Sequence, residues 1–271
     1  MNKKMTTDQI NEVAQQLFDA FSAKASFQPL TGSSRPNSLH EAYQIQSAVY
    51  ELMTTVGGLG PRGGHKIALT SAAIQSLVGL DTPIYGAMFA SQIHDTNRNI
   101  QLNEYGRLGL EFEVGVTMAA DVPASSTLYT KESIAPFVRS CAPAFELIED
   151  RAADYSQLDA YSILADRCWC AGAVLGEPVS DWNGLDLSAC LVQMICNGEV
   201  VDEASTGEAM GHPFNGLAWV ANYLNSIGRG LKKDEVVITG SALKTYFGEP
   251  GDQVSYRIAG LGEVNVTLAN A

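Results

Sequence analysis

The chain is poor in charged residues, and above all in basic ones. Its 271 residues include 17 Lys or Arg and 30 Asp or Glu, which gives a formal net charge of −13. This balance argues against a nucleic-acid partner, because binding to phosphates requires basic surfaces. Long apolar runs are missing as well. No stretch approaches the roughly 20 apolar residues that span a bilayer, so we expect no membrane partner either.

Cysteine is scarce and odd in number. Five cysteines in a chain of this length favour a reduced protein over a disulfide scaffold. The N-terminus runs from Lys3 and Lys4 into polar residues and not into an apolar segment, so no signal peptide is predicted. We therefore expect a cytoplasmic protein.

Signatures of nucleotide binding and of serine hydrolases are missing too. The chain has no GxGxxG segment after a predicted strand, no Walker A motif and no GxSxG motif. The sequence supports neither of these functions.

The residues that are present predict one globular domain. Hydrophobic residues make up 46% of the chain and charged residues 17%, which fits a packed core and not a disordered polypeptide. No repeat or long linker divides the chain. We predict a single domain over 1–271, with an N-terminal helical portion over 1–62 and a β-rich core over 63–271.

Hydrophobic periodicity and capping residues locate the elements. The patterns Thr6-x-x-Gln9 and Ser38-x-x-Glu41 predict capping boxes that open two helices in the helical portion. Asn197-Gly198 predicts a tight hairpin turn. Further helices are predicted for 130–140 and 213–227, and strands for 65–70, 108–118, 142–148, 191–196, 199–201, 235–239, 253–258 and 263–268. The predicted class is α+β.

Three glutamates form the most informative pattern in the chain. Glu111 and Glu113 lie two residues apart on a predicted strand, so both carboxylates point to one face while Phe112 packs on the other. Glu146 lies in a segment that is otherwise apolar on both faces, where an isolated carboxylate is costly and needs a partner. A solvated strand face, a pairing with Lys or Arg, and a shared divalent cation all stay open here. An all-oxygen donor set would suit Mg²⁺ or Mn²⁺.

Lys66 is the second candidate. It follows Gly63 and Gly64 in an otherwise apolar segment, and glycines allow another backbone to approach closely. One interpretation is a lysine at a strand end with its ammonium group in water. The other is an acid/base or electrostatic lysine that faces the carboxylates.

Short motifs along the chain resemble those of a known family. In chain order they are GHKIALTS (64–71), LEFE (110–113), PAFELIEDR (143–151), AD (165–166), VLG (174–176), GHP (211–213), AWVAN (218–222), TGS (239–241), PGD (250–252) and GLG (260–262). From about Tyr43 to its C-terminus, the chain is similar to the 2-keto-4-pentenoate hydratase / 4-oxalocrotonate decarboxylase family of the fumarylacetoacetase-like superfamily.

The resemblance implies a fold, a cofactor and an activity. The fold would be fumarylacetoacetase-like, a mixed β-roll flanked by helices, in a homo-oligomer. The β-rich core would bind Mg²⁺ or Mn²⁺ through Glu111, Glu113 and Glu146, with Lys66 as the catalytic residue. The substrate would be a small-molecule 2-hydroxy-2,4-dienoate (2-oxo-4-enoate). Its hydration to a 4-hydroxy-2-oxo acid would pass through an enolate that the metal stabilises, as in meta-cleavage degradation of aromatic compounds. The predicted substrate-binding residues are Ser71, Arg167 and Ser241.

Some positions depart from the family pattern. Hydratases often have Asp in a Pro-Asp-Phe-Gly-like stretch where this chain has Ile84, which is more similar to the decarboxylases. Ser241, in contrast, is typical of the hydratases. Arg167 stands where Asn is usual, and Trp169 stands where small or hydroxyl residues are usual. Arg167 either favours a substrate with a second carboxylate or pairs with an acidic residue at the surface.

Other functions therefore accompany the hydratase prediction. A 4-oxalocrotonate-type decarboxylase or an acylpyruvate C–C hydrolase would use the same metal site. A hydrolase would also need a catalytic His–Glu pair, and neither His40 nor His94 lies in a recognisable setting for one. A non-catalytic protein that binds a metal and an oxo acid is the alternative of another class. The presence of Lys66 and the three glutamates counts against it.

Overall fold

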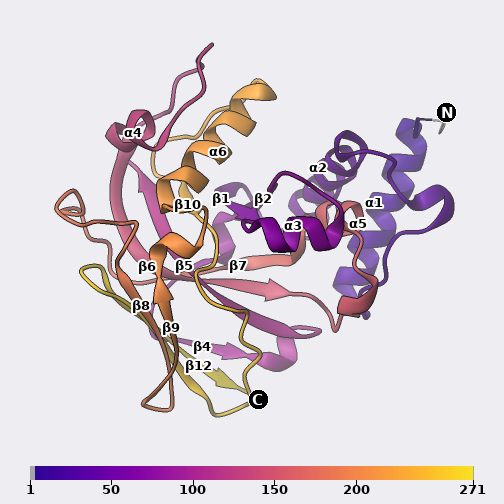
Figure 1. The fold of residues 1–271 in the computed structure, drawn as a ribbon. Helices are drawn as coiled ribbons and strands as arrows, with labels where there is room; N and C mark the ends of the chain where they lie inside the picture. The colour runs from indigo at the N-terminus through magenta and orange to yellow at the C-terminus, as the bar shows by residue number, and fades with distance from the viewer. Residues whose placement is uncertain (1–3, 271) are drawn as a thin grey trace.

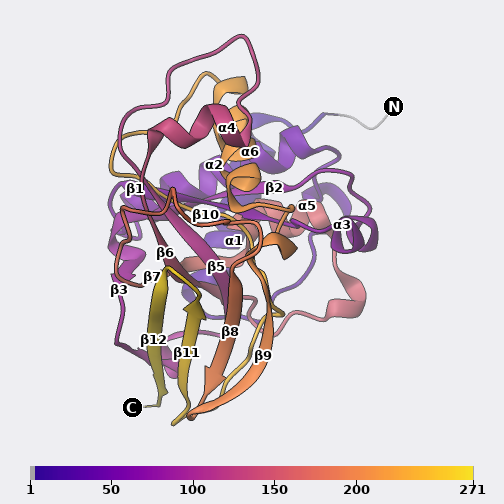
Figure 2. The ribbon, with the colours of Figure 1, turned by 60° about the vertical axis from the view of Figure 1, so that its left-hand side comes forward.

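Two mixed β-sheets and a group of helices make up the computed structural model, which describes residues 4–270 (Figures 1 and 2). The helices are α1 (Thr7–Ser22), α2 (Leu39–Thr55), α3 (Ala72–Val78), α4 (Lys131–Ile134), α5 (Ala160–Ala165) and α6 (Pro213–Ser226). The strands are β1 (Arg62–Ala68), β2 (Ile84–Phe89), β3 (Ile93–Asp95), β4 (Arg98–Gln101), β5 (Leu108–Met118), β6 (Val138–Glu149), β7 (Cys170–Leu175), β8 (Leu191–Cys196), β9 (Glu199–Ser205), β10 (Val236–Ile238), β11 (Gln253–Ile258) and β12 (Gly262–Ala269).

The larger sheet has the strand order β2-β1-β10-β5-β6-β7-β3, and the smaller has the order β4-β12-β11-β8-β9. Both views place the smaller sheet at the opposite end of the molecule from α2 and α6. None of the helices within residues 4–270 combines the length and the apolar character that crossing a membrane requires. The α+β prediction is confirmed, while the homo-oligomer and the cytoplasmic location stay predictions.

The two helices of the N-terminal portion begin where their capping residues predict. Thr6 Oγ1 accepts a hydrogen bond from the Gln9 N–H (3.2 Å), and the Gln9 side chain accepts one from the Thr6 N–H (3.0 Å). At α2 only half of the predicted capping box forms. Ser38 caps the Glu41 N–H (3.2 Å), but the Glu41 carboxylate binds the backbone N–H groups of Met5 and Asn37 instead. Glu41 thereby ties the segment before α1 to the start of α2.

One predicted strand and the predicted hairpin agree with the structure, whereas one predicted helix is too long. Strand β5 covers the predicted residues 108–118, and the hairpin at Asn197-Gly198 is confirmed, with φ of 53° and 87° as a two-residue type I′ turn requires. The helix predicted for 130–140 is wrong over its second half. Helix α4 ends at Ile134, a 3₁₀ turn over Ala135–Phe137 follows, and β6 begins at Val138. Pro136 explains this, because it has no N–H to continue an α-helix.

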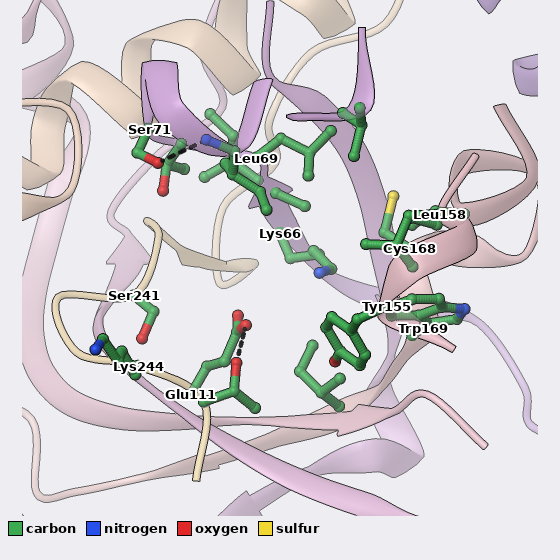
Figure 3. Close-up of a pocket in the computed structure, with 18 of the residues that line it drawn as sticks. Lys66, Leu69, Ser71, Glu111, Tyr155, Leu158, Cys168, Trp169, Ser241 and Lys244 are labelled. Atoms are coloured by element: carbon green, nitrogen blue, oxygen red, sulfur yellow. Dashed lines mark hydrogen bonds between the residues drawn. The ribbon is translucent and has the colours of Figure 1, made fainter. Parts of the chain in front are cut away.

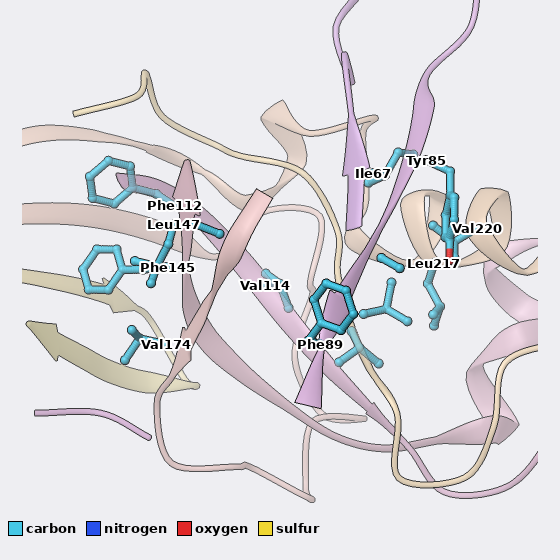
Figure 4. Close-up of a cluster of buried hydrophobic side chains, with 14 of the residues drawn as sticks. Ile67, Tyr85, Phe89, Phe112, Val114, Phe145, Leu147, Val174, Leu217 and Val220 are labelled. Carbon is cyan, nitrogen blue, oxygen red and sulfur yellow. The ribbon is translucent and has the colours of Figure 1, made fainter. Parts of the chain in front are cut away.

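The sheets pack against each other through aromatic side chains of β5 and β6. The rings of Phe112 and Phe145 lie 5.6 Å apart, and Tyr256 of β11 packs 5.4 Å from Phe112. Figure 4 shows Phe112 and Phe145 in one buried group with Leu147 and Val174. Because side chains alternate along a strand, the immediate neighbours of Phe112 and Phe145 point to the opposite face of the larger sheet.

Candidate active site

The antiparallel pairing of β5 and β6 brings the three glutamates together. Glu111 lies directly opposite Glu146, and Glu113 follows two residues later on the same face of β5. One carboxylate oxygen from each residue lies within 4.8 Å of the other two. Glu113 and Glu146 are fully buried, whereas Glu111 is partly exposed. The interpretation of a solvated strand face is therefore wrong for this part of the sheet.

Lys66 faces this carboxylate cluster from β1. Its Nζ lies 2.8 Å from Oε1 of Glu146, and its side chain is buried. Gly86, opposite Lys66 on β2, leaves room for it, since a Cβ at residue 86 would lie 3.0 Å from the Lys66 Cγ. The interpretation of a strand-end lysine with its ammonium group in water is thus also wrong.

The loop after β10 holds two of the carboxylates. The Gly240 N–H donates to Oε2 of Glu113 (2.5 Å), at a φ of +104° that favours glycine. Thr245 Oγ1 donates to Oε1 of Glu111 (2.9 Å). Oε1 of Glu113 is buried and has no hydrogen-bond partner within residues 4–270. Such an orphaned oxygen is unusual in a folded protein and calls for an explanation.

Burial and mutual repulsion change the pKa values of the cluster. Burial, followed by the charges of Glu146 and Glu111, raises the pKa of Glu113 well above its usual value. Burial also raises the pKa of Glu146, to about 7, although Lys66 opposes the change. Burial alone would lower the pKa of Lys66, but the facing carboxylates, Glu146 foremost, raise it above its ordinary value. Three carboxyl groups thus face a single ammonium group at a place where charge is poorly solvated.

These observations fit a divalent cation. The cluster offers three carboxylate oxygens that converge on one point, and the orphaned Oε1 of Glu113 would gain a partner there. An all-oxygen donor set is the kind that Mg²⁺ and Mn²⁺ prefer.

A cavity of about 390 Å³ opens beside the cluster, with Lys66 and Glu111 in its lining (Figure 3). Two predicted substrate-binding residues also line it. Ser71 caps α3, its Oγ accepting a hydrogen bond from the Ile74 N–H (3.3 Å). Ser241 Oγ accepts a hydrogen bond from the Phe112 N–H (2.8 Å) and donates one to a backbone carbonyl.

Arg167, the third predicted substrate-binding residue, is not in the lining of this cavity. Its buried guanidinium group donates to the Cys170 carbonyl (2.8 Å) and stacks 4.3 Å from the centre of the Phe21 ring on α1. It is therefore not a residue that pairs with a surface acid. Its placement does not support the predicted contact with substrate.

Other residues at the cavity were not predicted from the sequence. Tyr155, Leu158 and Lys244 line the cavity, and Thr245 binds Glu111. Lys244 and Thr245 lie just after the Thr239-Gly240-Ser241 motif, and that proximity was the available signal. Tyr155 and Leu158 lie in a polar loop that carried none.

A His–Glu pair is present in the structure, although not at this cavity. His65 Nε2 lies 2.9 Å from Oε2 of Glu235, and His65 Nδ1 lies 2.9 Å from the Tyr85 hydroxyl. Because His65 precedes Lys66 on β1, it points to the other face of the strand. The pair is thus poorly placed to serve a hydrolase at the carboxylate cluster.

The sequence from Lys66 onward matches a known family. Residues 66–269 match the family described as fumarylacetoacetate (FAA) hydrolase, C-terminal. The chain belongs to the FAA hydrolase family. The matched region contains Lys66, all three glutamates and the loop that holds them.

Relatives of this FAA hydrolase family member align over nearly its whole length. The 2-keto-4-pentenoate hydratase of Paraburkholderia xenovorans is 28% identical, over 96% of this chain and 95% of that protein. The 2-hydroxyhexa-2,4-dienoate hydratase of Comamonas testosteroni is 26% identical, over 95% of this chain and 96% of that protein. Among solved structures, the 4-oxalocrotonate decarboxylase from Pseudomonas putida G7, complexed with magnesium and adipate, has the same fold. Its TM-score is 0.89 at 24% identity, over 98% of this chain and 100% of that one.

Proposed function

We propose that this protein is a divalent-metal-dependent hydro-lyase that converts a 2-hydroxy-2,4-dienoate (2-oxo-4-enoate) into a 4-hydroxy-2-oxo acid. The observation that carries the proposal is the buried cluster of Glu111, Glu113 and Glu146 with Lys66 beside one cavity. The names of the relatives that span nearly the whole chain support this activity.

The three glutamates would hold the cation, with Mg²⁺ or Mn²⁺ as the proposed ion. The magnesium in the P. putida decarboxylase structure agrees with this proposal. When bound, the ion would supply Lewis-acid chemistry at the carboxylate and the 2-oxygen of the substrate.

The side chains of the cavity provide the remaining functions. Lys66 is held protonated, so its ammonium group can stabilise negative charge on the substrate. Its raised pKa comes mainly from the opposing charge of Glu146. With a cation bound by the glutamates, the charge of Glu146 would be offset and Lys66 would be a better proton donor. Ser71 is placed to donate its hydroxyl hydrogen, which its capping contact does not use.

The test uses protein treated with a chelator and enzymatically generated 2-hydroxypenta-2,4-dienoate. We expect loss of dienol absorbance only after Mg²⁺ or Mn²⁺ is added back, with 4-hydroxy-2-oxopentanoate as the product. Glu113→Gln should abolish this metal-dependent loss of absorbance. Glu132→Gln, which removes an exposed carboxylate of α4, is the matched control and should keep the activity. Metal binding without turnover would overturn the hydratase proposal.

Product analysis separates the alternatives on the same site. Release of CO₂ from 4-oxalocrotonate with little hydration would favour the decarboxylase, and cleavage of an acylpyruvate would favour the hydrolase. Binding of metal and oxo acid with no turnover of any of these compounds would favour the non-catalytic protein.

A further inference from the structure

We infer that the substrate carries an uncharged, apolar extension beyond C5, and that Tyr155, Leu158 and Trp169 select it. This inference rests on the proposed function and specifies the substrate class of the same site. We call Tyr155, Leu158 and Trp169 the far wall of the cavity, and Ser71, Ser241 and Lys244 its near wall.

The two walls lie on opposite sides of the reactive groups. Figure 3 shows Glu111 and Lys66 in the middle of the cavity, between the two walls. The near wall offers two hydroxyl groups and one ammonium group. These groups suit the C1 carboxylate of an oxo acid, and a substrate placed in this way at the cation that Glu111 would help to hold extends its carbon chain toward the far wall.

The polar atoms of the far wall are directed elsewhere. The Tyr155 hydroxyl donates to Oδ2 of Asp150 (3.1 Å). The thiol of the neighbouring Cys168 donates to the Tyr85 carbonyl (3.5 Å). The indole nitrogen of Trp169 points away from the cavity (Figure 3). The far wall therefore presents ring and aliphatic carbon to the cavity.

The described lining residues provide no free cation at the far wall. Lys66 lies between the two walls beside Glu146, and Lys244 lies on the near wall. Arg107 is paired with Asp150, and the guanidinium group of Arg167 is turned toward Cys170 and Phe21. A carboxylate at the distal end of the substrate would therefore be desolvated without an opposite charge, which is strongly unfavourable. An alkyl group would instead gain hydrophobic contact.

The size of the cavity agrees with an extension. A volume of about 390 Å³ lies in the range of pockets that enclose drug-sized ligands, and a five-carbon acid fills only part of it.

The test compares the kcat/KM values of four dienols: 2-hydroxypenta-, 2-hydroxyhexa- and 2-hydroxyhepta-2,4-dienoate, and 2-hydroxyhexa-2,4-dienedioate. We expect kcat/KM to rise about three- to fourfold with each added carbon, the gain from burying one methylene group. The dienedioate should fall at least about a hundredfold below the hexadienoate, which has a methyl group in place of the second carboxylate. Equal use of these two compounds would overturn the inference.

Matched variants test which residues of the cavity discriminate between the two substrates. Leu158→Lys places a cation on the far wall and should narrow the gap between hexadienoate and dienedioate by at least about tenfold. Leu128→Lys makes the same change at a side chain that is 76% exposed and outside the cavity lining, and should leave the gap unchanged. Lys244→Met should raise KM for all four compounds by a similar factor. A rise in KM for the dienedioate alone would instead indicate that Lys244 binds the distal carboxylate, and it would overturn the inference.

A binding experiment separates this inference from the proposed function. Saturated 2-oxo acids do not react, and their binding to the Mg²⁺-loaded protein can be followed by calorimetry. If no dienol is turned over but 2-oxoheptanoate binds at least about tenfold more tightly than 2-oxoadipate, the proposed function fails and the inference stands. If the dienols are hydrated without discrimination, the inference fails and the proposed function stands.

Discussion

Replacing Lys66 by methionine should destabilise the metal-free protein and at the same time strengthen its binding of divalent cations. Methionine has a similar length and volume, so the main loss is the ammonium group 2.8 Å from Glu146. Three carboxyl groups would then share a buried site with no opposing charge. A purely structural lysine far from a metal site would show the first effect without the second.

The size of the effect follows from the geometry. At an effective dielectric constant of about 20, two unit charges 2.8 Å apart attract by about 6 kcal/mol, which sets an upper limit. Protonation of Glu146 limits the cost, because the pKa of this group is already raised to about 7. We therefore expect Lys66→Met to lower the free energy of unfolding of the metal-free protein by about 3–5 kcal/mol, as for other broken buried ion pairs. In a chain of this size, that loss lowers Tm by about 10 °C.

Thermal unfolding in chelator and in Mg²⁺ measures both effects. The Tm gain on adding Mg²⁺ should be larger for Lys66→Met than for the wild type, because the cation replaces the missing charge. Lys232→Met is the matched control, since it removes a lysine from an exposed pair with Asp121 (2.9 Å), and should change Tm by less than about 2 °C. An unchanged Tm for Lys66→Met in chelator, or a smaller gain from Mg²⁺, would refute the reasoning.

Three further predictions concern the same region. Glu113→Gln should weaken Mg²⁺ binding at least about a hundredfold in calorimetry, because it replaces a charged oxygen donor with a neutral amide. In chelator the same variant should be more stable than the wild type. The pKa of Glu113 is raised in the folded wild type above its ordinary value of 4.5, so the wild type loses stability as the pH rises above that value. The variant has no carboxyl group there, so the Tm difference between the variant and the wild type should grow from about pH 5 to 8. Arg167→Met should lower the free energy of unfolding by about 2–4 kcal/mol, because it removes the contacts with the Cys170 carbonyl and the Phe21 ring. The ratio of the kcat/KM values for hexadienoate and dienedioate should not change. A fall in kcat/KM for the dienedioate alone would instead indicate that Arg167 binds the substrate.

The members of the carboxylate cluster could be singled out because each stands out in its local sequence. Strand β5 shows its period-two pattern in sequence, which puts Glu111 and Glu113 on one face, and a glutamate in an apolar segment is conspicuous. The pairing that sets Glu146 opposite Glu111 was not predictable in this way, because residues 119–137 connect β5 to β6 and no tight turn fixes the register of the two strands. The position of Lys66 likewise depends on Gly86, a residue on another strand with no pattern of its own.

Arg167 shows where reasoning from sequence fails. An arginine beside a predicted site suggests an anion ligand, but the direction of a side chain depends on backbone angles that the sequence does not display. Arg167, Cys168 and Trp169 have φ of 58°, 54° and 58°, three consecutive left-handed residues without a glycine. Each costs about 1–2 kcal/mol, so the surrounding contacts must stabilise the segment.

The contacts that stabilise this segment come from the N-terminal helical portion. Phe21 of α1 packs on the Arg167 guanidinium group, and Phe27 meets the Trp169 ring edge to face at 5.0 Å. The strained backbone in turn directs Arg167 away from the cavity and brings the Trp169 ring to its far wall. Phe21 and Phe27 lie outside the stretch that matches the FAA hydrolase family, residues 66–269, yet their contacts stabilise the segment that places Trp169 on the far wall of the candidate substrate cavity. Substrate selection can therefore change through α1 and the loop that follows it, while the carboxylate cluster stays as it is.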